Sequence, residues 1–286
     1  MIGLLLLLLP VSAQAAPIKV VASFSILADM VGEITGEHAA VVALVGRNGD
    51  AHAFDPSPAD AGKLADAGLV IANGLGLDGW IERLAGSAGY TGKIVVASAG
   101  IVPQVRPGSS APDPHAWQDL KNGIAYVRSI ETALEAADPA NAGAYQQAAN
   151  RYAAKLAALD TEVRAKIAGI AEAKRRVITS HDAFGYFGEA YGVTFLAAAG
   201  ISTDTEPSAG GIARLVDQIR AEGIKAVFLE NMTDPRLIGT IAAETGTTPG
   251  GTLYSDALSA PDGPAATYAA MFAYNVITLT QGMARN

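Results

Sequence analysis

A long helical stretch in the middle of the chain most restricts the fold, because strand and helix patterns alternate on both sides of it. The stretch covers residues 139–173 and begins at Asp138-Pro139, which suits an N-cap followed by a proline in the first turn. Its apolar residues recur every three to four positions, as Tyr145, Tyr152, Leu156, Leu159, Val163, Ile167 and Ile170. At ~1.5 Å per residue the helix would be on the order of 50 Å long, which is more than one domain needs. We therefore expect it to bridge two lobes.

Short apolar runs rich in Val and Ile alternate with helical patterns before and after this stretch. Such alternation favours parallel sheets flanked by helices. The sequence thus predicts an α/β protein with two lobes, each with a mainly parallel sheet flanked by helices, joined by one long rigid helix. The expected boundaries are residues 16–138 for the N-terminal lobe, 139–173 for the bridging helix and 174–286 for the C-terminal lobe.

The first fifteen residues have a different composition. An apolar run from Ile2 to Leu9 is too short to cross a bilayer as a helix, and Ala13-Gln14-Ala15 has the small residues that a signal peptidase recognises. We predict that residues 1–15 are a signal peptide and that the mature chain is soluble, periplasmic and not membrane-spanning. The sequence contains no cysteine, so we expect neither disulfides nor a lipid anchor.

The formal net charge is −8, and there is no run of Lys or Arg. A phosphate backbone is recognised mainly through clustered positive charge. The charge therefore argues against a nucleic-acid partner.

Three of the four histidines and one aspartate follow predicted strands. These residues are His52, His115, His181 and Asp256, and the strands before them end at Val45, Ala97, Thr179 and Leu253. Ligands of open α/β sheets bind at the edge where strands end. If both sheets turn that edge to a shared cleft, three imidazoles and one carboxylate meet there, a set that Zn²⁺ prefers. The fourth histidine, His38, lies in a helix-to-strand turn and is expected to be exposed, at the opposite edge and without a role.

Other polar and aromatic residues leave alternatives open. Any one of the loop histidines could equally be a solvated surface residue. Four carboxylates could accept hydrogen bonds from imidazole N–H groups or could serve as solvated or capping residues, and they are Asp113, Asp182, Glu206 and Glu230. Trp80 and Trp117 are expected to be packing residues.

A zinc-dependent hydrolase is the alternative from a different functional class. A catalytic zinc keeps an open coordination position and works with a general base. The chain has no His-Glu-x-x-His pattern, and its proposed site already has four protein ligands. We therefore predict a binding protein and not an enzyme.

Several motifs together resemble the zinc/manganese class of periplasmic solute-binding proteins of ABC transporters. They are His52-Ala53-Phe54-Asp55-Pro56-Ser57-Pro58, Asn73-Gly74-Leu75-Gly76-Leu77-Asp78-Gly79-Trp80, Asp113-Pro114-His115-Ala116-Trp117, Thr179-Ser180-His181-Asp182-Ala183-Phe184-Gly185-Tyr186-Phe187, Glu206-Pro207-Ser208 and Tyr254-Ser255-Asp256-Ala257-Leu258-Ser259. The resemblance covers nearly all of the predicted mature chain. It implies that His52, His115, His181 and Asp256 hold one transported Zn²⁺ per chain in the cleft between the lobes, and that the protein delivers this ion to a membrane permease.

The resemblance also bears on the identity of the ion and on how it is loaded. Manganese members of this class have a carboxylate at the position of His181, so zinc is the expected ion and manganese the alternative. Many zinc members have a His-rich loop before the second ligand, whereas residues 98–114 contain no histidine. This difference suggests that a periplasmic zinc metallochaperone loads the protein. We expect the protein to be a monomer.

Overall fold

The computed structural model describes residues 16–105 and 111–286. The predicted signal peptide, residues 1–15, lies outside the described residues. Within the described ranges, no helix is both long enough and apolar enough to cross a membrane.

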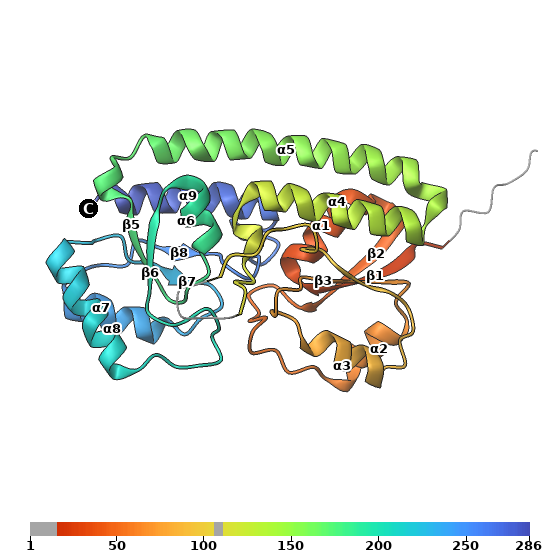
Figure 1. Cartoon of the computed structure of the whole chain (residues 1–286), viewed down its shortest axis with the longest axis horizontal. Coiled ribbons are helices and arrows are strands. Elements are labelled where there is room, and N and C mark those ends of the chain that lie inside the picture. Colours follow the sequence, from red (N-terminus) through yellow and green to blue (C-terminus); the bar gives the residue numbers. More distant parts are fainter. Residues whose placement is uncertain (1–15, 106–110) are drawn as a thin grey trace, which may run out of the picture.

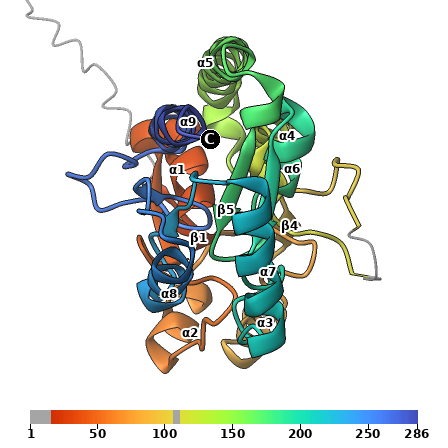
Figure 2. The same cartoon turned by 90° about the vertical axis from the view of Figure 1, so that its left-hand side faces the viewer.

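The N-terminal half contains a parallel four-stranded sheet in the order β2-β1-β3-β4. Its strands are β1 (Ile18–Phe24), β2 (Ala39–Val45), β3 (Leu69–Ala72) and β4 (Ile94–Val96). The central strand β3 is buried throughout, as expected for a parallel sheet covered on both faces. Helices α1 (Ser25–Thr35) and α4 (Leu120–Ala137) lie on one side of the sheet, and α2 (Pro58–Ala65) and α3 (Trp80–Ser87) lie on the other (Figures 1 and 2).

The C-terminal half repeats this strand order. Strands β5 (Arg176–Thr179) and β6 (Thr194–Ala197) pair in parallel, as do β7 (Leu229–Glu230) and β8 (Thr252–Leu253). A parallel bridge between Ile178 and Val227 joins the two pairs, so the order is β6-β5-β7-β8. Helices α6 (Gly185–Tyr191) and α9 (Tyr268–Met283) lie toward the long helix, and α7 (Ala209–Glu222) and α8 (Pro235–Thr245) lie on the far side (Figure 1).

The apolar runs at residues 226–229 and 248–253 predict longer strands than β7 and β8, which contain two residues each. The run at residues 248–253 pairs only over Thr252–Leu253. Pro249 has no N–H to donate, and Gly251 has a φ of 134°, which is outside the strand region for other residues. The strand therefore begins only after Gly251.

Helix α5 (Ala142–Ala168) runs along both halves (Figure 1). It is shorter than the predicted bridge at both ends. Residues Pro139–Asn141 form a 3₁₀ turn instead, and the helix ends at Ala168, because the next residue is Gly169 and glycine has a low helix propensity. Its buried face matches the predicted stripe at Tyr145, Tyr152, Leu156, Val163 and Ile167. Helix α4 packs beside α5, so a helix pair covers the N-terminal half. The boundaries 16–138, 139–173 and 174–286 themselves stay a prediction.

The fold class is confirmed: parallel sheets flanked by helices lie in two halves along one long helix. His38, expected to be exposed, is instead half-buried, and its ring lies edge-on to Tyr145 at a centroid distance of 6.1 Å.

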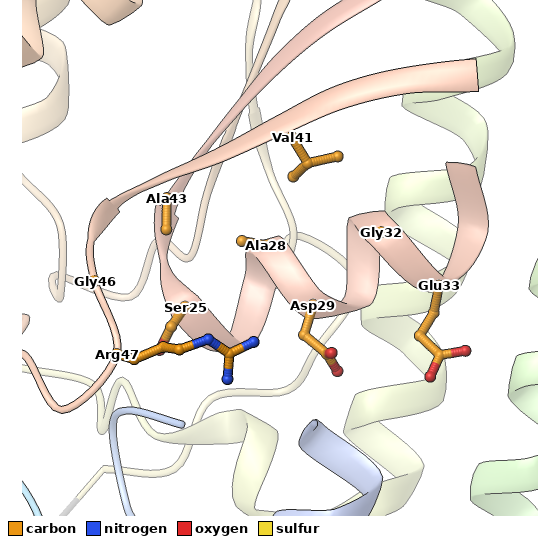
Figure 3. A pocket seen from close by; sticks show the side chains of 9 residues that line it. All are labelled: Ser25, Ala28, Asp29, Gly32, Glu33, Val41, Ala43, Gly46 and Arg47. Atoms are coloured by element: carbon orange, nitrogen blue, oxygen red, sulfur yellow. The ribbon is translucent and has the colours of Figure 1, made fainter. Parts of the chain in front are cut away.

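Polar contacts join the two halves beside a pocket on α1 (Figure 3). The Asp29 carboxylate accepts a hydrogen bond from the backbone N–H of Tyr268, the first residue of α9, at 2.8 Å. The Arg47 guanidinium donates to the carbonyl oxygens of Ser259 and Ala266, both at 2.8 Å. One cluster of buried apolar side chains also extends through both halves. The halves therefore share a core and are not independently packed lobes.

Asp29 ionises with difficulty at this junction. Burial is the main cause that raises its pKa to about 6, and the nearby carboxylate of Glu33 adds to the effect. The Tyr268 N–H, Arg47 and Lys155 lower the pKa of Asp29, but their combined effect is smaller than that of burial and Glu33. Because the folded pKa lies above the ordinary value of 3.8, ionisation of Asp29 lowers stability as the pH rises through the range from about 4 to about 6.

We predict that Asp29→Asn stabilises the metal-free protein above pH 7 and that this gain disappears near pH 4. Asn cannot ionise, and it keeps an oxygen that can accept the Tyr268 N–H. A difference of about two pKa units corresponds to at most about 3 kcal/mol of unfolding free energy. Urea unfolding in excess chelator between pH 4 and pH 8 measures the gain, with Glu37→Gln, which removes an exposed carboxylate, as the control. A gain that does not change with pH would contradict the assignment.

Candidate metal centre

The structure brings all four predicted ligands together between the two halves. One ligand atom from each of His52, His115, His181 and Asp256 lies within 4.8 Å of the other three. His115, His181 and Asp256 are buried, and the side chain of His52 is 6% exposed. His52 follows β2, His115 follows β4, His181 follows β5 and Asp256 follows β8. The predicted convergence of strand ends is therefore present in the fold.

The distances between ligand atoms suit a small ion. The Nε2 atoms of His52 and His115 are 3.1 Å apart, and the Nε2 of His181 is 3.0 Å from Asp256 Oδ2. Asp256 Oδ2 lies 3.4 Å from His52 Nε2, and Asp256 Oδ1 lies 3.7 Å from His115 Nε2. Four donors at ~2.0–2.1 Å from a tetrahedral ion are about 3.3 Å apart. The pocket thus has the size of a four-coordinate site.

Two further carboxylates lie behind the imidazoles. Asp113 Oδ1 is 2.7 Å from His115 Nδ1, and Glu230 Oε2 is 2.8 Å from His181 Nδ1, although this second pair is not aligned as a hydrogen bond. Asp113 also accepts the backbone N–H of His115, and Glu230 accepts that of His181. Such contacts fix the ring so that Nε2 faces a metal. Two of the four candidate carboxylates, Asp113 and Glu230, therefore have this position.

Aromatic packing holds the histidine loops, as predicted for both tryptophans. Trp117 is fully buried, its ring lies 5.3 Å from that of His115, and its Nε1 donates to the carbonyl of Ser255 at 2.9 Å. The Trp80 ring packs on Phe54 with a centroid distance of 4.8 Å. Trp117 thereby connects the His115 loop to the residue that precedes Asp256.

Sequence reasoning did not single out Asp50, which holds the loop of His52. Its Oδ1 accepts the backbone N–H groups of His52 and Ala53 at 2.9 and 3.3 Å. The same spacing occurs at Asp113 and His115, where Oδ1 of the aspartate also accepts the histidine N–H. The repeated Asp-x-His pattern was the signal that could have identified Asp50.

The charges around the site favour a cation. Burial disfavours the imidazolium form, but the carboxylates of Asp256 and Asp113 outweigh it and raise the pKa of His115 to about 9. Against the same effect of burial, Glu230 and Asp256 raise the pKa of His181 well above its usual value. Burial alone would raise the pKa of Asp256, yet the imidazoles of His181 and His115 hold it well below its usual value. Buried carboxylates thus attract positive charge to the centre.

Comparison with known proteins identifies the family. A family model described as "ZnuA: Zinc-uptake complex component A periplasmic" matches residues 20–282. The chain belongs to the ZnuA family. It is 32% identical over 274 residues to the manganese-binding lipoprotein MntA of Halalkalibacterium halodurans, covering 96% of this chain and 91% of that protein. It is 33% identical over 274 residues to the iron-binding protein YfeA of Yersinia pestis, covering 95% and 88%.

Solved structures agree with this membership of the ZnuA family. The periplasmic zinc binding protein TroA from Treponema pallidum has a TM-score of 0.90 and 26% identity, covering 93% of this chain and 99% of that chain. The manganese-bound periplasmic metal binding protein from Candidatus Liberibacter asiaticus has a TM-score of 0.83 and 30% identity, with the same coverage. The predicted resemblance is confirmed. This ZnuA-family chain is a metal-binding substrate-binding protein of an ABC transporter, which works with a membrane permease and is not an enzyme.

Replacing Asp113 by Asn should weaken metal binding by about 10- to 100-fold, because the His115 ring loses the carboxylate that orients it and increases its basicity. Isothermal titration of metal-free protein with Zn²⁺ measures the change. Asp262→Asn, which removes an exposed carboxylate, is the matched control. Equal affinities for the two variants would exclude a role for Asp113 at the site.

Proposed function

We propose that this protein binds one Zn²⁺ through His52, His115, His181 and Asp256 and delivers it to its ABC permease for import. One observation carries the proposal: three imidazole nitrogens and one carboxylate face one another in a buried space that fits a tetrahedral ion. The second oxygen of that carboxylate supports it further. Asp256 Oδ1 is buried and has no hydrogen-bond partner among the described residues, as expected for an oxygen that faces a cation.

The choice of zinc rests on the ligand types. The relatives named above are described as binding manganese, iron or zinc, so their names do not decide between metals. Imidazole suits zinc, whereas manganese favours carboxylate and water oxygens with six-fold coordination. With His181 as the third imidazole, the site has three nitrogen ligands and one carboxylate ligand, a set that suits zinc better than manganese. Manganese is the alternative.

The cellular setting is also a proposal. We place the protein in the periplasm as a soluble monomer. We expect no lipid anchor, because the sequence contains no cysteine to carry one, although relatives such as MntA are named lipoproteins. The absence of histidine from residues 98–114 supports loading by a periplasmic zinc metallochaperone.

The wild-type protein should prefer Zn²⁺ to Mn²⁺ by several orders of magnitude, and His181→Glu should reduce this preference. The variant replaces a nitrogen donor by the carboxylate oxygen that manganese favours. Competition titrations with a calibrated chelator measure both ions on both proteins. His38→Glu adds the same charge at a histidine outside the centre and is the matched control. Displacement of Zn²⁺ from the wild type by Mn²⁺ at comparable concentrations would show that the preference is wrong.

Acid should release the bound zinc, because protons compete with the metal for the imidazole nitrogens. Zinc content after dialysis at stepwise lower pH tests this expectation. Retention of stoichiometric zinc at pH 4 would argue against a site dominated by histidine.

A further inference from the structure

A cavity of about 580 Å³ reaches the metal centre from the surface. It lies between the His52 loop of the N-terminal half and the residues after β6 and β7 in the C-terminal half. Its lining includes the ligand His181, its neighbour Ser180, Asp50, Thr203, Glu206 and Leu237. The Ser180 hydroxyl is buried and has no hydrogen-bond partner among the described residues. The cavity therefore connects solvent with one of the candidate ligands, His181.

The loop after β6 connects ligands from both halves. Near its base, the Ala199 N–H donates to the Ser180 carbonyl at 2.9 Å, and the Gly200 carbonyl accepts the Asp182 N–H at 3.0 Å. Ser180 and Asp182 flank His181 in the chain. At its tip, the Thr203 hydroxyl donates to Asp50 Oδ2 at 2.7 Å. The loop thus contacts the neighbours of His181 at one end and the residue that holds His52 at the other.

Asp50 uses its two oxygens for different partners. Oδ1 accepts the backbone N–H groups of His52 and Ala53, and Oδ2 accepts the Thr203 hydroxyl. Unlike His115 and His181, His52 has no carboxylate near its Nδ1 among the described residues. The ring of His52 therefore depends on its loop for its position, and Asp50 is the residue that orders this loop.

We propose that Asp50 is a positioning residue that couples the Thr203 loop to His52, so that the Asp50–Thr203 hydrogen bond slows departure of the bound ion through the cavity. This proposal rests on the proposed metal site. When the bond breaks, the loop after β6 is free to move away from the cavity, and His52 is the ligand with the least support in its coordinating position. Loss of one ligand then precedes release of the ion.

The test is the rate of Zn²⁺ release from the full-length protein into excess chelator, followed by stopped flow. Thr203→Val should release zinc roughly tenfold faster, because a hydrogen bond to a charged group is lost. Thr203→Ser keeps the hydroxyl and should restore the wild-type rate. Thr205→Val is the matched control, since Thr205 is an exposed hydroxyl lining the same cavity.

A double-mutant cycle tests the coupling itself. Asp50→Ala should also accelerate release, and Asp50→Ala combined with Thr203→Val should be little faster than Asp50→Ala alone, because the Asp50–Thr203 hydrogen bond is already absent from each single variant. Rates that multiply in the double variant, or a wild-type rate for Thr203→Val, would overturn the proposal. Equilibrium zinc binding by the wild type separates the two ideas. If one zinc per chain binds and release is insensitive to Thr203, the coupling is wrong. If no zinc binds, the proposed function is wrong.

Discussion

The structure depends on holding three imidazoles and a carboxylate in mutual contact inside the protein. These buried polar groups lie 3.0–3.7 Å from one another. A small displacement would leave one of them buried without a hydrogen-bond partner, which costs free energy, so the surrounding residues must hold them in place. Asp113, Glu230 and Trp117 supply this support: Asp113 lies two residues before His115, Glu230 ends β7, and Trp117 lies in the short helical turn after His115. The four candidate ligands are thus held in place by residues outside the ligand set.

The scaffold makes this support possible by joining the two halves firmly. A shared apolar core, the long helix α5 and the contacts of Asp29 and Arg47 with residues 259–268 join the two halves. The segments that carry the four candidate ligands follow the strands and extend from this joined frame.

Most of the fold and the four candidate ligands could be predicted from the sequence. Strand runs and the stripe of α5 are local patterns, and a histidine after each of several strands indicates a shared edge. Helix α5 ends before Gly169 and strand β8 begins after Gly251. In both places a single glycine interrupts a favourable run, so the sequence pattern predicts a longer helix and a longer strand than the structure has. The Asp-x-His pattern points to Asp50, but the contact of Asp50 with Thr203 joins residues 153 positions apart, and no local pattern contains that information.

The repeated strand order gives the chain an internal two-fold relation. In the orders β2-β1-β3-β4 and β6-β5-β7-β8, the loops after β2 and β6 occupy equivalent places, as do those after β4 and β8. Equivalent loops meet in both cases: Asp50 contacts Thr203, and His115 faces Asp256. The centre therefore resembles the isologous interface of a homodimer built within one chain. In a homodimer, equivalent loops have the same sequence and place the same residues at the interface. Here the two halves belong to one chain and differ in sequence, so equivalent loops can carry different residues. A site with three histidines and one aspartate can therefore form between two halves that have the same strand order.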